Sequence, residues 1–369
     1  MTAKKPFDFS TVCVEPGCPI REAVAQMDRT RQGIVLVVDG ERRLLGTVTD
    51  GDMRRALLAR IDLDGPISVL LARKEGTPLA RPLSAPATAS RDACRKLLKE
   101  HKLLHLPLLD KEQRVVGLVF LNELVPDHAI GLRAVVMAGG KGSRLLPLTK
   151  DTPKQMLDVG DQTLMEIILE QIRDAGIKQV HVSTHHHKDK IVEYFGDGKE
   201  LGLDLNYLDE DRPLGTAGAL GLMAPSDETI LVINGDILTQ MDFRAMHAYH
   251  KELGADLTVA VSQYDIKVPY GVIECDGSFV RAITEKPTLE FFVGAGIYLL
   301  EPAMTRYIPK GQRSDMTDLI ASLIRSGHKV ASFPIREYWL DIGQHGDYKK
   351  ASRQVKAWQD AGPDAGRPK

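Results

Sequence analysis

The order of apolar and polar positions divides the chain into two parts. In the first part, residues 20–27 and 91–98 have the spacing of amphipathic helices, and each helix is followed by two short apolar strands. From residue 134 onward, buried strands alternate with helices. The main predicted elements are strands at 134–138, 179–184, 230–234, 257–262 and 295–300, and a helix at 163–175. Such alternation predicts an α/β domain with a mainly parallel sheet covered on both faces.

The first part contains an internal repeat. Residues 34–53 align without gaps on residues 105–124, so that Asp39 matches Asp110 and Gly46 matches Gly117. The Pro-, Ala- and Ser-rich segment 77–90 between the copies predicts a loop. A unit this small cannot bury both faces of its sheet alone, so we expect the two copies to pack together.

This repeat resembles a tandem pair of CBS domains (a Bateman module). We place the pair at residues 1–128, with repeats at about 8–65 and 66–128, and a short linker at 125–133. The family binds the ribose of an adenine nucleotide through a T-x-x-D motif.

The first copy supplies that motif as Thr49 and Asp52, whereas the second has Phe120 and Glu123 and cannot supply the hydroxyl. Asp52 would equally cap the following helix. A regulatory adenine or guanine nucleotide at Thr49 and Asp52, and a purely structural role, both stay open.

A glycine-rich turn, Gly139 to Arg144, directly follows the strand at 134–138. Glycines permit positive φ and let backbone N–H groups approach a phosphate, while Lys141 and Arg144 add positive charge. The spacing fits neither G-x-G-x-x-G nor the P-loop. The turn predicts a phosphate-binding loop of another kind.

The run G-G-x-G-S-R-L, followed by P-L-T and P-K, resembles the signature of sugar-phosphate nucleotidylyltransferases. The resemblance implies a Rossmann-like, mainly parallel sheet at 132–355. We place a tail at 356–369 and expect its residues 362–369 to be disordered. The resemblance also implies that Arg144 holds the departing pyrophosphate and that Lys154 contacts phosphate. It assigns nucleotide binding to the turn and to a second small-residue loop, through Ala138, Gly139, Gly140, Gly142, Ser143, Gly215, Thr216 and Gly218. Helix-to-sheet packing is the alternative for the glycines of the second loop.

Two aspartates lie in or directly after apolar runs, Asp236 after 230–234 and Asp341 within 339–343. One carboxylate alone holds Mg²⁺ weakly, so a second ligand is expected. The resemblance pairs Asp236 and Asp341 as ligands of Mg²⁺, which is the one cofactor we expect. The histidines at 185–187 are adjacent on a strand end, and their alternating side chains cannot all bind one ion.

The resemblance also places Tyr270, Gly271, Glu285 and Lys286 on the side of the sugar 1-phosphate. It implies that Lys286 neutralises the attacking phosphate and that Glu285 binds sugar hydroxyls. The family usually has Asn where this chain has Gly294, which leaves the identity of the sugar open.

The predicted reaction is in-line attack by a sugar 1-phosphate on a nucleoside triphosphate, with pyrophosphate leaving. We expect Arg144, Lys141, Lys154 and Lys286 to neutralise charge, and no general base to be needed. Segments 153–157, 210–219 and 339–341 resemble CBS-containing sugar-1-phosphate guanylyltransferases such as glucosamine-1-phosphate guanylyltransferase, which act in bacterial surface-sugar pathways. GTP and glucosamine 1-phosphate are therefore preferred over mannose or heptose 1-phosphate and over UTP, CTP or dTTP. The alternative from a different functional class is a nucleotide-sensing regulatory protein with a decayed catalytic domain.

Composition narrows the partners. The chain has 369 residues, a formal net charge of −2 and four cysteines with no CxxC pair. The small net charge does not predict binding to nucleic acid, so small-molecule substrates are the expected partners. The scattered cysteines argue against a disulfide framework and fit a cytoplasmic protein. No apolar run or leader predicts a membrane protein or a secretion signal. A homo-oligomer is expected by analogy with CBS pairs, which often associate face to face.

Overall fold

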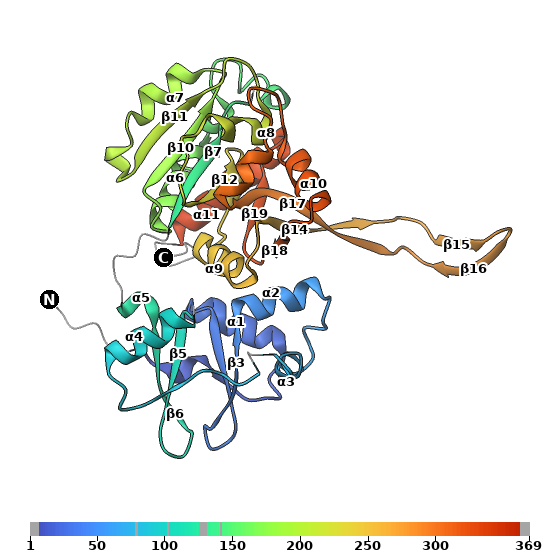
Figure 1. Cartoon of the computed structure of the whole chain (residues 1–369). Coiled ribbons are helices and arrows are strands. Elements are labelled where there is room, and N and C mark those ends of the chain that lie inside the picture. Colours follow the sequence, from blue (N-terminus) through green and yellow to red (C-terminus); the bar gives the residue numbers. More distant parts are fainter. Residues whose placement is uncertain (1–6, 78–79, 102, 125–130, 141, 362–369) are drawn as a thin grey trace. The chain divides into compact units, whose positions relative to one another are not determined.

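The computed structural model describes residues 7–77, 80–101, 103–124, 131–140 and 142–361 (Figure 1). Lys141, most of the predicted linker and the end of the predicted tail lie outside these ranges. The chain divides into two compact units, Met1–Ala129 and Ile130–Lys369, which are described separately below.

The first unit repeats one small fold twice. Each copy has a three-stranded sheet in which the first strand is parallel to the second and the second is antiparallel to the third. The first copy contains η1 (Phe9–Val12), β1 (Cys13–Val14), α1 (Ile20–Thr30), β2 (Ile34–Val38), β3 (Leu44–Thr49), α2 (Asp50–Leu58) and α3 (Ser68–Ala72). The second contains β4 (Ala85–Pro86), α4 (Arg91–Glu100), β5 (His105–Leu109), β6 (Val115–Phe120) and α5 (Leu121–Leu124).

The two copies share a core, as the repeat predicts. Leu36 and Val38 of β2 form one apolar cluster with Leu109 of β5 and Val115 of β6. The hairpin turns are also joined through the backbone, because Leu44 N donates to the carbonyl of residue 113 at 3.1 Å. Each copy therefore covers a sheet face that the other would leave exposed.

The second unit is built on a seven-stranded sheet in the order β11-β10-β7-β12-β17-β14-β18. Only β17 runs against its neighbours, so the predicted mainly parallel α/β sheet is confirmed. The strands are β7 (Leu132–Met137), β10 (Gln179–Thr184), β11 (Asp204–Asp209), β12 (Thr229–Asn234), β14 (Leu257–Lys267), β17 (Thr288–Leu300) and β18 (Val330–Pro334).

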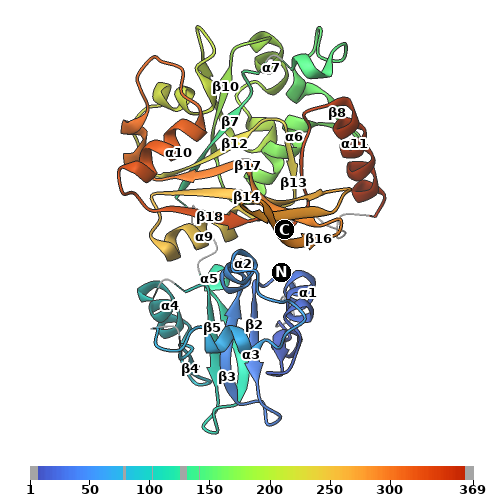
Figure 2. The same cartoon turned by 90° about the vertical axis from the view of Figure 1, so that its right-hand side faces the viewer.

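Helices cover both faces of this sheet (Figure 2). Alternate residues of β7 separate accordingly: Ala134 and Val136 pack in one apolar cluster, and Val135 packs in the other. Helices α6 (Leu164–Asp174), α7 (Lys188–Phe195), α9 (Phe243–Leu253) and α11 (His345–Asp360) contribute to the first cluster. Helices α8 (Gly215–Gly218) and α10 (Met316–Arg325) contribute to the second.

Short elements complete the second unit. They are the strand pairs β8 (Asp158–Val159) with β9 (Gln162–Thr163) and β13 (Ile237–Thr239) with β19 (Trp339–Asp341), and the 3₁₀ helices η2 (Ser143–Leu145), η3 (Lys154–Met156), η4 (Lys199–Leu201), η5 (Ala219–Leu222) and η6 (Pro302–Tyr307).

The structure differs from the sequence prediction at the C-terminal tail and in the length of two strands. The predicted tail from residue 356 is wrong at its start, because α11 continues to Asp360. Val355 is buried there, and the Trp358 ring meets Tyr338 edge to face at 5.2 Å, which holds the last turns of the helix on the unit.

The predicted strands at 257–262 and 295–300 are too short. β14 and β17 continue past the sheet as a two-stranded ribbon, which ends in the hairpin of β15 (Val272–Asp276) and β16 (Phe279–Thr284). We call residues 263–292 the arm; Figure 1 shows it extending away from the α/β sheet beyond β14 and β17.

Candidate active site

A cavity of about 360 Å³ lies at the carboxyl ends of β7 and β12. The two strands are neighbours, and Met137 at the end of β7 pairs with Asn234 at the end of β12. In parallel sheets this edge is where ligands bind. The lining residues are Met137, Gly139, Gly140, Gly142, Ser143, Arg144, Leu145, Lys154, Gln155, Ser183, Glu210, Pro213, Gly215, Thr216, Asn234, Asp236 and Gly343.

The glycine-rich turn forms one wall of the cavity. Gly142 has φ +61°, and a Cβ there would lie 3.0 Å from Thr149 Cγ2 and 3.2 Å from Lys154 Cβ. Thr149 Oγ1 donates to the Gly142 carbonyl at 2.8 Å, which closes the turn. The following residues form η2, whose Leu145 is fully buried and anchors the wall that Arg144 lines. The described residues of the predicted phosphate loop therefore line the cavity, except for Ala138, which is buried in the core.

Lys154 and Asp236 form an ion pair beside this turn. Lys154 Nζ lies 2.6 Å from Asp236 Oδ2, and the side chains are 9% and 27% exposed. Lys154 comes from η3, while Asp236 follows β12 in the chain. The structure thus brings together two residues that the sequence predicted for the phosphate and the metal.

Asp341 is held next to Asp236 by the backbone. It lies opposite Ile237 in the β13–β19 pair, and Ile342 N donates to the Asp236 carbonyl at 3.0 Å. The pKa of Asp341 is raised, first by partial removal of its carboxyl from water and next by the negative charge of Asp236, while Lys154 and Arg144 act in the opposite direction. Two carboxylates that destabilise each other's charge are suited to a cation.

The Asp236–Asp341 pair fits Mg²⁺ as a shared ligand set. Within the described ranges, no group of three or more His, Cys, Asp or Glu side chains could hold a metal. Mg²⁺ is commonly bound through one or two carboxylates, with substrate phosphates and water completing its shell. The predicted pair therefore matches that mode of binding, although Asp341 itself does not line the cavity.

The residues of the second small-residue loop divide between the cavity and the packed interior. Gly215 and Thr216 line the cavity. Gly218 does not; a Cβ there would lie 3.0 Å from the Gln312 carbonyl, so this glycine permits close packing. Thr216 Oγ1 accepts from Met316 N at 2.9 Å, which ties the loop to the start of α10.

Glu210 is a buried carboxylate of the cavity that the sequence analysis did not single out. It is 6% exposed, it accepts a hydrogen bond from Ser183 Oγ, and its Oε2 accepts from Leu214 N at 2.7 Å. His185 Nδ1 lies 2.7 Å from its carbonyl oxygen. The sequence signal that could have pointed to Glu210 is its position at the start of segment 210–219, which resembles guanylyltransferases.

Two further polar atoms face no protein partner. Gln155 Oε1 and Asn234 Oδ1 are buried, and no hydrogen-bond partner is found for either among the described residues. Both residues line the cavity. Buried acceptors of this kind are normally satisfied, so a ligand or water with hydrogen-bond donors is expected here.

The residues predicted for the sugar side lie elsewhere. Tyr270 and Gly271 are in the arm, between β14 and β15, and Glu285 and Lys286 follow β16. Tyr270 is 74% exposed, and the Lys286 ammonium lies 3.8 Å from Glu285. Gly294 is at the base of the arm, opposite Val261. None of these five residues lines the cavity, because β14 and β17 carry the arm away from the sheet.

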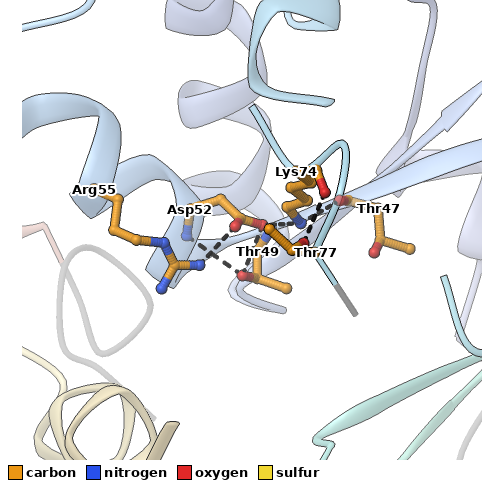
Figure 3. A network of polar contacts seen from close by, with 6 residues as sticks. All are labelled: Thr47, Thr49, Asp52, Arg55, Lys74 and Thr77. Carbon is orange, nitrogen blue, oxygen red and sulfur yellow. Dashed lines mark hydrogen bonds and ion pairs between the residues drawn. The ribbon is translucent and has the colours of Figure 1, made fainter. Parts of the chain in front are cut away.

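The predicted nucleotide motif of the first unit forms a closed polar network (Figure 3). Thr49 and Asp52 make a capping box at the start of α2: Thr49 N donates to Asp52 Oδ2 at 2.8 Å, and Asp52 N donates to Thr49 Oγ1 at 3.4 Å. Lys74 Nζ lies 2.5 Å from Asp52 Oδ2, and Arg55 Nη2 lies 2.6 Å from Oδ1. Both carboxylate oxygens of Asp52 are thus already paired with cations.

The charge of Asp52 is stabilised by this network. Burial alone would raise the pKa of Asp52, but Lys74, the Thr49 N–H and Arg55 together lower it. In the second copy Phe120 is 5% exposed, with its ring 5.6 Å from His105 and 5.2 Å from Phe7. That position belongs to the core.

No helix in the described parts of the chain is long and apolar enough to cross a membrane.

Each of the two units contains a match to a known protein family. The sequence model of the nucleotidyl transferase family matches residues 133–357, and that of the CBS domain matches residues 7–59, within the first copy. The second copy has the same strand order but lies outside the matched range.

Curated relatives match the second unit. A UTP–glucose-1-phosphate uridylyltransferase of Synechocystis sp. is 32% identical over 245 residues, which cover 61% of this chain and 63% of the relative. A mannose-1-phosphate guanylyltransferase of Mycobacterium tuberculosis is 31% identical over 231 residues, which cover 60% and 64%. The chain thus spans less than two thirds of the length of these relatives.

A solved structure assigned as a glucose-1-phosphate thymidylyltransferase of Bacillus anthracis is also similar. It has a TM-score of 0.52 and 25% identity, and the match covers 61% of this chain and 95% of that one. The family match extends over more than half of the chain, across the strands and turns that form the cavity and across Asp236 and Asp341. The chain therefore belongs to the nucleotidyl transferase family and carries a CBS domain in its first unit.

Proposed function

We propose that the second unit transfers a nucleoside monophosphate from a nucleoside triphosphate to a sugar 1-phosphate, giving a nucleotide sugar and pyrophosphate. The observation that carries this proposal is the cavity between the Gly139–Arg144 turn and the Lys154–Asp236 ion pair. The names of all three relatives above describe transfer of a nucleotidyl group to a sugar 1-phosphate.

The chain's own groups would bind and align two anions. The backbone of the turn and Arg144 would hold the phosphates that leave as pyrophosphate, with Lys141 as a further proposed contact. Lys154 would neutralise the reacting phosphates. Asp236 and Asp341 would hold Mg²⁺, which would supply further neutralisation of phosphate charge. The sugar phosphate is already ionised, so alignment and charge stabilisation suffice and no general base is required.

GTP is the proposed triphosphate, and Glu210 provides the physical reason. A carboxylate only accepts hydrogen bonds. Guanine presents two adjacent donors, N1–H and the N2 amino group, whereas uracil and thymine present one donor between two acceptors. Glu210 is buried and lines the cavity together with Gly215 and Thr216. Its two oxygens already accept from Ser183 Oγ and Leu214 N, and their remaining lone pairs would favour a base edge with paired donors.

A matrix of nucleoside triphosphates against sugar 1-phosphates, scored by pyrophosphate release, tests the proposal. We expect GTP to be preferred and Glu210→Gln to lower kcat/KM for GTP by about 10- to 100-fold relative to UTP, since an unpaired polar group then faces the base. An unchanged ratio would refute the role of Glu210. Thermal unfolding of the variant separates a binding effect from loss of the fold.

Glucosamine 1-phosphate is the proposed acceptor, with mannose 1-phosphate and heptose 1-phosphate as the alternatives in the same matrix. The proposal for the sugar rests on the resemblance of segments 153–157, 210–219 and 339–341 to guanylyltransferases. From the family resemblance we also propose that Tyr270, Gly271, Glu285, Lys286 and Gly294 contact the sugar 1-phosphate, although none of them lines the cavity described above.

The alternative of a regulator with a decayed catalytic domain is disfavoured by the cavity itself. Arg144, Lys154 and Asp236 all line it, and the ion pair is formed. Absence of pyrophosphate release with every substrate pair would favour the regulator. We also propose that an adenine or guanine nucleotide bound near Thr49 and Asp52 regulates the enzyme, provided that it can displace Lys74 from Asp52.

A further inference from the structure

One face of the arm is apolar along both of its strands. Tyr264 of β14 lies directly opposite Phe291 of β17, and Ile266 lies opposite Leu289. Side chains of directly paired residues project from the same face of an antiparallel ribbon, and every second residue joins them. We call these four side chains the apolar arm face.

The other face of the same ribbon is mainly polar, with Phe292, 38% exposed and opposite Gln263, as its large apolar residue. Asp265 lies opposite Glu290, and Lys267 lies opposite Thr288. Gln263 Nε2 donates to Asp265 Oδ1 at 3.1 Å on this face. The alternation is that of a ribbon with one face in water and the other covered.

The apolar arm face is uncovered in the single chain. Its four residues are 43–55% exposed. The tip adds large apolar residues that are 54–81% exposed, namely Tyr270, Ile273, Phe279, Val280 and Ile283. Together they expose on the order of 1,000 Å² of apolar surface, which exceeds the roughly 300–600 Å² of the largest patch on a typical monomer.

The ribbon also lacks strand neighbours. β14 pairs with β18 only up to Val261, and β17 pairs with β12 only from Ile297 onward. Beyond these points the described strands of the arm pair only with each other. An isolated two-stranded ribbon is marginally stable in water, so the arm needs a surface that covers it.

We propose that the apolar arm face is covered by the arm of a second copy of this chain, in a two-fold symmetric dimer. The apolar arm faces of two copies, with the tip residues on the same side, bury on the order of 1,000 Å² in all, which reaches the lower limit of a specific protein–protein interface. A two-fold axis places the same face on both sides of the contact, so a charge near the axis would meet the same charge of the other copy. The apolar arm face contains no charged residue, while Asp265, Lys267 and Glu290 remain on the solvent side.

Sedimentation of the full chain over a range of concentrations tests this dimer. We expect a reversible dimer for the natural chain and at least about 100-fold weaker association for Tyr264→Lys combined with Phe291→Lys, because two central aromatic residues are lost from each copy. The matched control is Gln263→Lys combined with Thr288→Lys, which adds the same charge on the polar face of the same strands. It should dimerise as the natural chain does.

A monomeric natural chain, or a dimer that both double variants leave equally intact, would overturn the proposal. Hydrogen exchange of the natural chain gives a second measurement that does not depend on any variant folding. Amides of residues 262–293 should exchange more slowly at concentrations above the dimer dissociation constant than below it. Exchange that is the same at both concentrations would also contradict the dimer. Neither measurement depends on which reaction the cavity catalyses.

Discussion

The ammonium of Lys154 lies 2.6 Å from Asp236 Oδ2. The lysine therefore positions the carboxylate that we propose as a metal ligand. The two groups come from η3 and from the end of β12, which the fold brings to one side of the phosphate-binding turn. A cation and the phosphates of the substrates would therefore compete with a pre-existing ion pair. The contributions of Lys154 and Asp236 to the stability of the second unit and to catalysis should therefore depend on each other.

Replacing either member of this pair should reveal that dependence. We expect Asp236→Asn to lower kcat by about 10²- to 10³-fold, since a group that stabilises phosphate charge is lost. It should also destabilise the second unit by roughly 1–3 kcal/mol, because Lys154 would remain largely buried without its partner. Urea unfolding and pyrophosphate release measure the two effects.

The double variant with Lys154→Met is the control for the stability effect. Its cost should be smaller than the sum of the two single costs, because no buried charge is then left unpaired. Strict additivity would show that the ion pair does not stabilise the fold.

Asp341 predicts a dependence of stability on metal. Its pKa is raised above the ordinary value of 3.8, so its contribution to stability is full below that value and is lost as the pH rises through the folded-state pKa. At neutral pH the ionised carboxylate is therefore unfavourable unless a cation is bound. Mg²⁺ should raise the Tm of the natural chain, by about 2–4 °C for each kcal/mol of binding free energy.

In Asp341→Asn the Tm without metal should rise and the Mg²⁺ effect should largely disappear. Asp347→Asn is the matched control, since Asp347 also raises the pKa of Asp341 but lies in α11. An equal Mg²⁺ shift in all three proteins would rule out Asp341 as a ligand.

Two glycines of the same turn should respond differently to alanine. At Gly142 the positive φ and the contacts at 3.0–3.2 Å with Thr149 and Lys154 make a Cβ unfavourable by roughly 1–3 kcal/mol. At Gly140 no described atom lies within 4 Å of the added Cβ. Gly142→Ala should lower the Tm, while Gly140→Ala should leave the Tm unchanged and raise KM only if substrate phosphate approaches the backbone there. Equal Tm values would contradict the strain at Gly142.

Lys74 should stabilise the first unit through Asp52. The pKa of Asp52 is lowered below its ordinary value of 3.8, so the stability it contributes is present above that value and is lost as the pH falls through the folded-state pKa. Lys74→Met should cost roughly 1–3 kcal/mol at neutral pH and flatten the acid-side loss. Hydrogen exchange of residues 44–60 reports on this unit alone. A variant with the acid-side profile of the natural chain would show that Lys74 is not the controlling partner.

The same lysine should limit nucleotide binding. A ribose can reach Asp52 only after Lys74 is displaced, so Lys74→Met should bind an adenine or guanine nucleotide about tenfold more tightly than the natural chain does. Calorimetry on the full chain, with Asp52→Ala as the control, measures this. Equal binding by the natural chain and Asp52→Ala would leave Asp52 as a helix cap only.

Much of the active-site geometry follows from the local sequence. Apolar runs predict β7 and β12, and parallel strands carry the residues that follow them to one edge. That rule is sufficient to bring Gly142, Arg144 and Asp236 together, as the cavity shows. Lys154 required the family resemblance, because it comes from a 3₁₀ turn without a periodic pattern.

What the sequence did not predict depends on tertiary contacts. Glu210 becomes a cavity residue only because Ser183 and Leu214 hold its carboxylate. The positions of Tyr270 and Lys286 depend on where two strands leave the sheet, which alternation along the chain does not specify. The end of α11 depends on the packing of Trp358 against Tyr338.

The strand β17 restricts where the chain can gain or lose residues. Between its pairings of Gly294 with Val261 and of Tyr298 with Val259 lies a bulge, in which Gly296 has φ +72° and a Cβ would come within 2.7 Å of Asn234 Nδ2. One residue inserted between Phe291 and Gly296 would turn the arm side chains of β17 to the opposite face and out of match with β14, or move a side chain against Asn234. Insertions and deletions in related chains should therefore collect at the arm's tip, around Gly277, and be absent from the bulge.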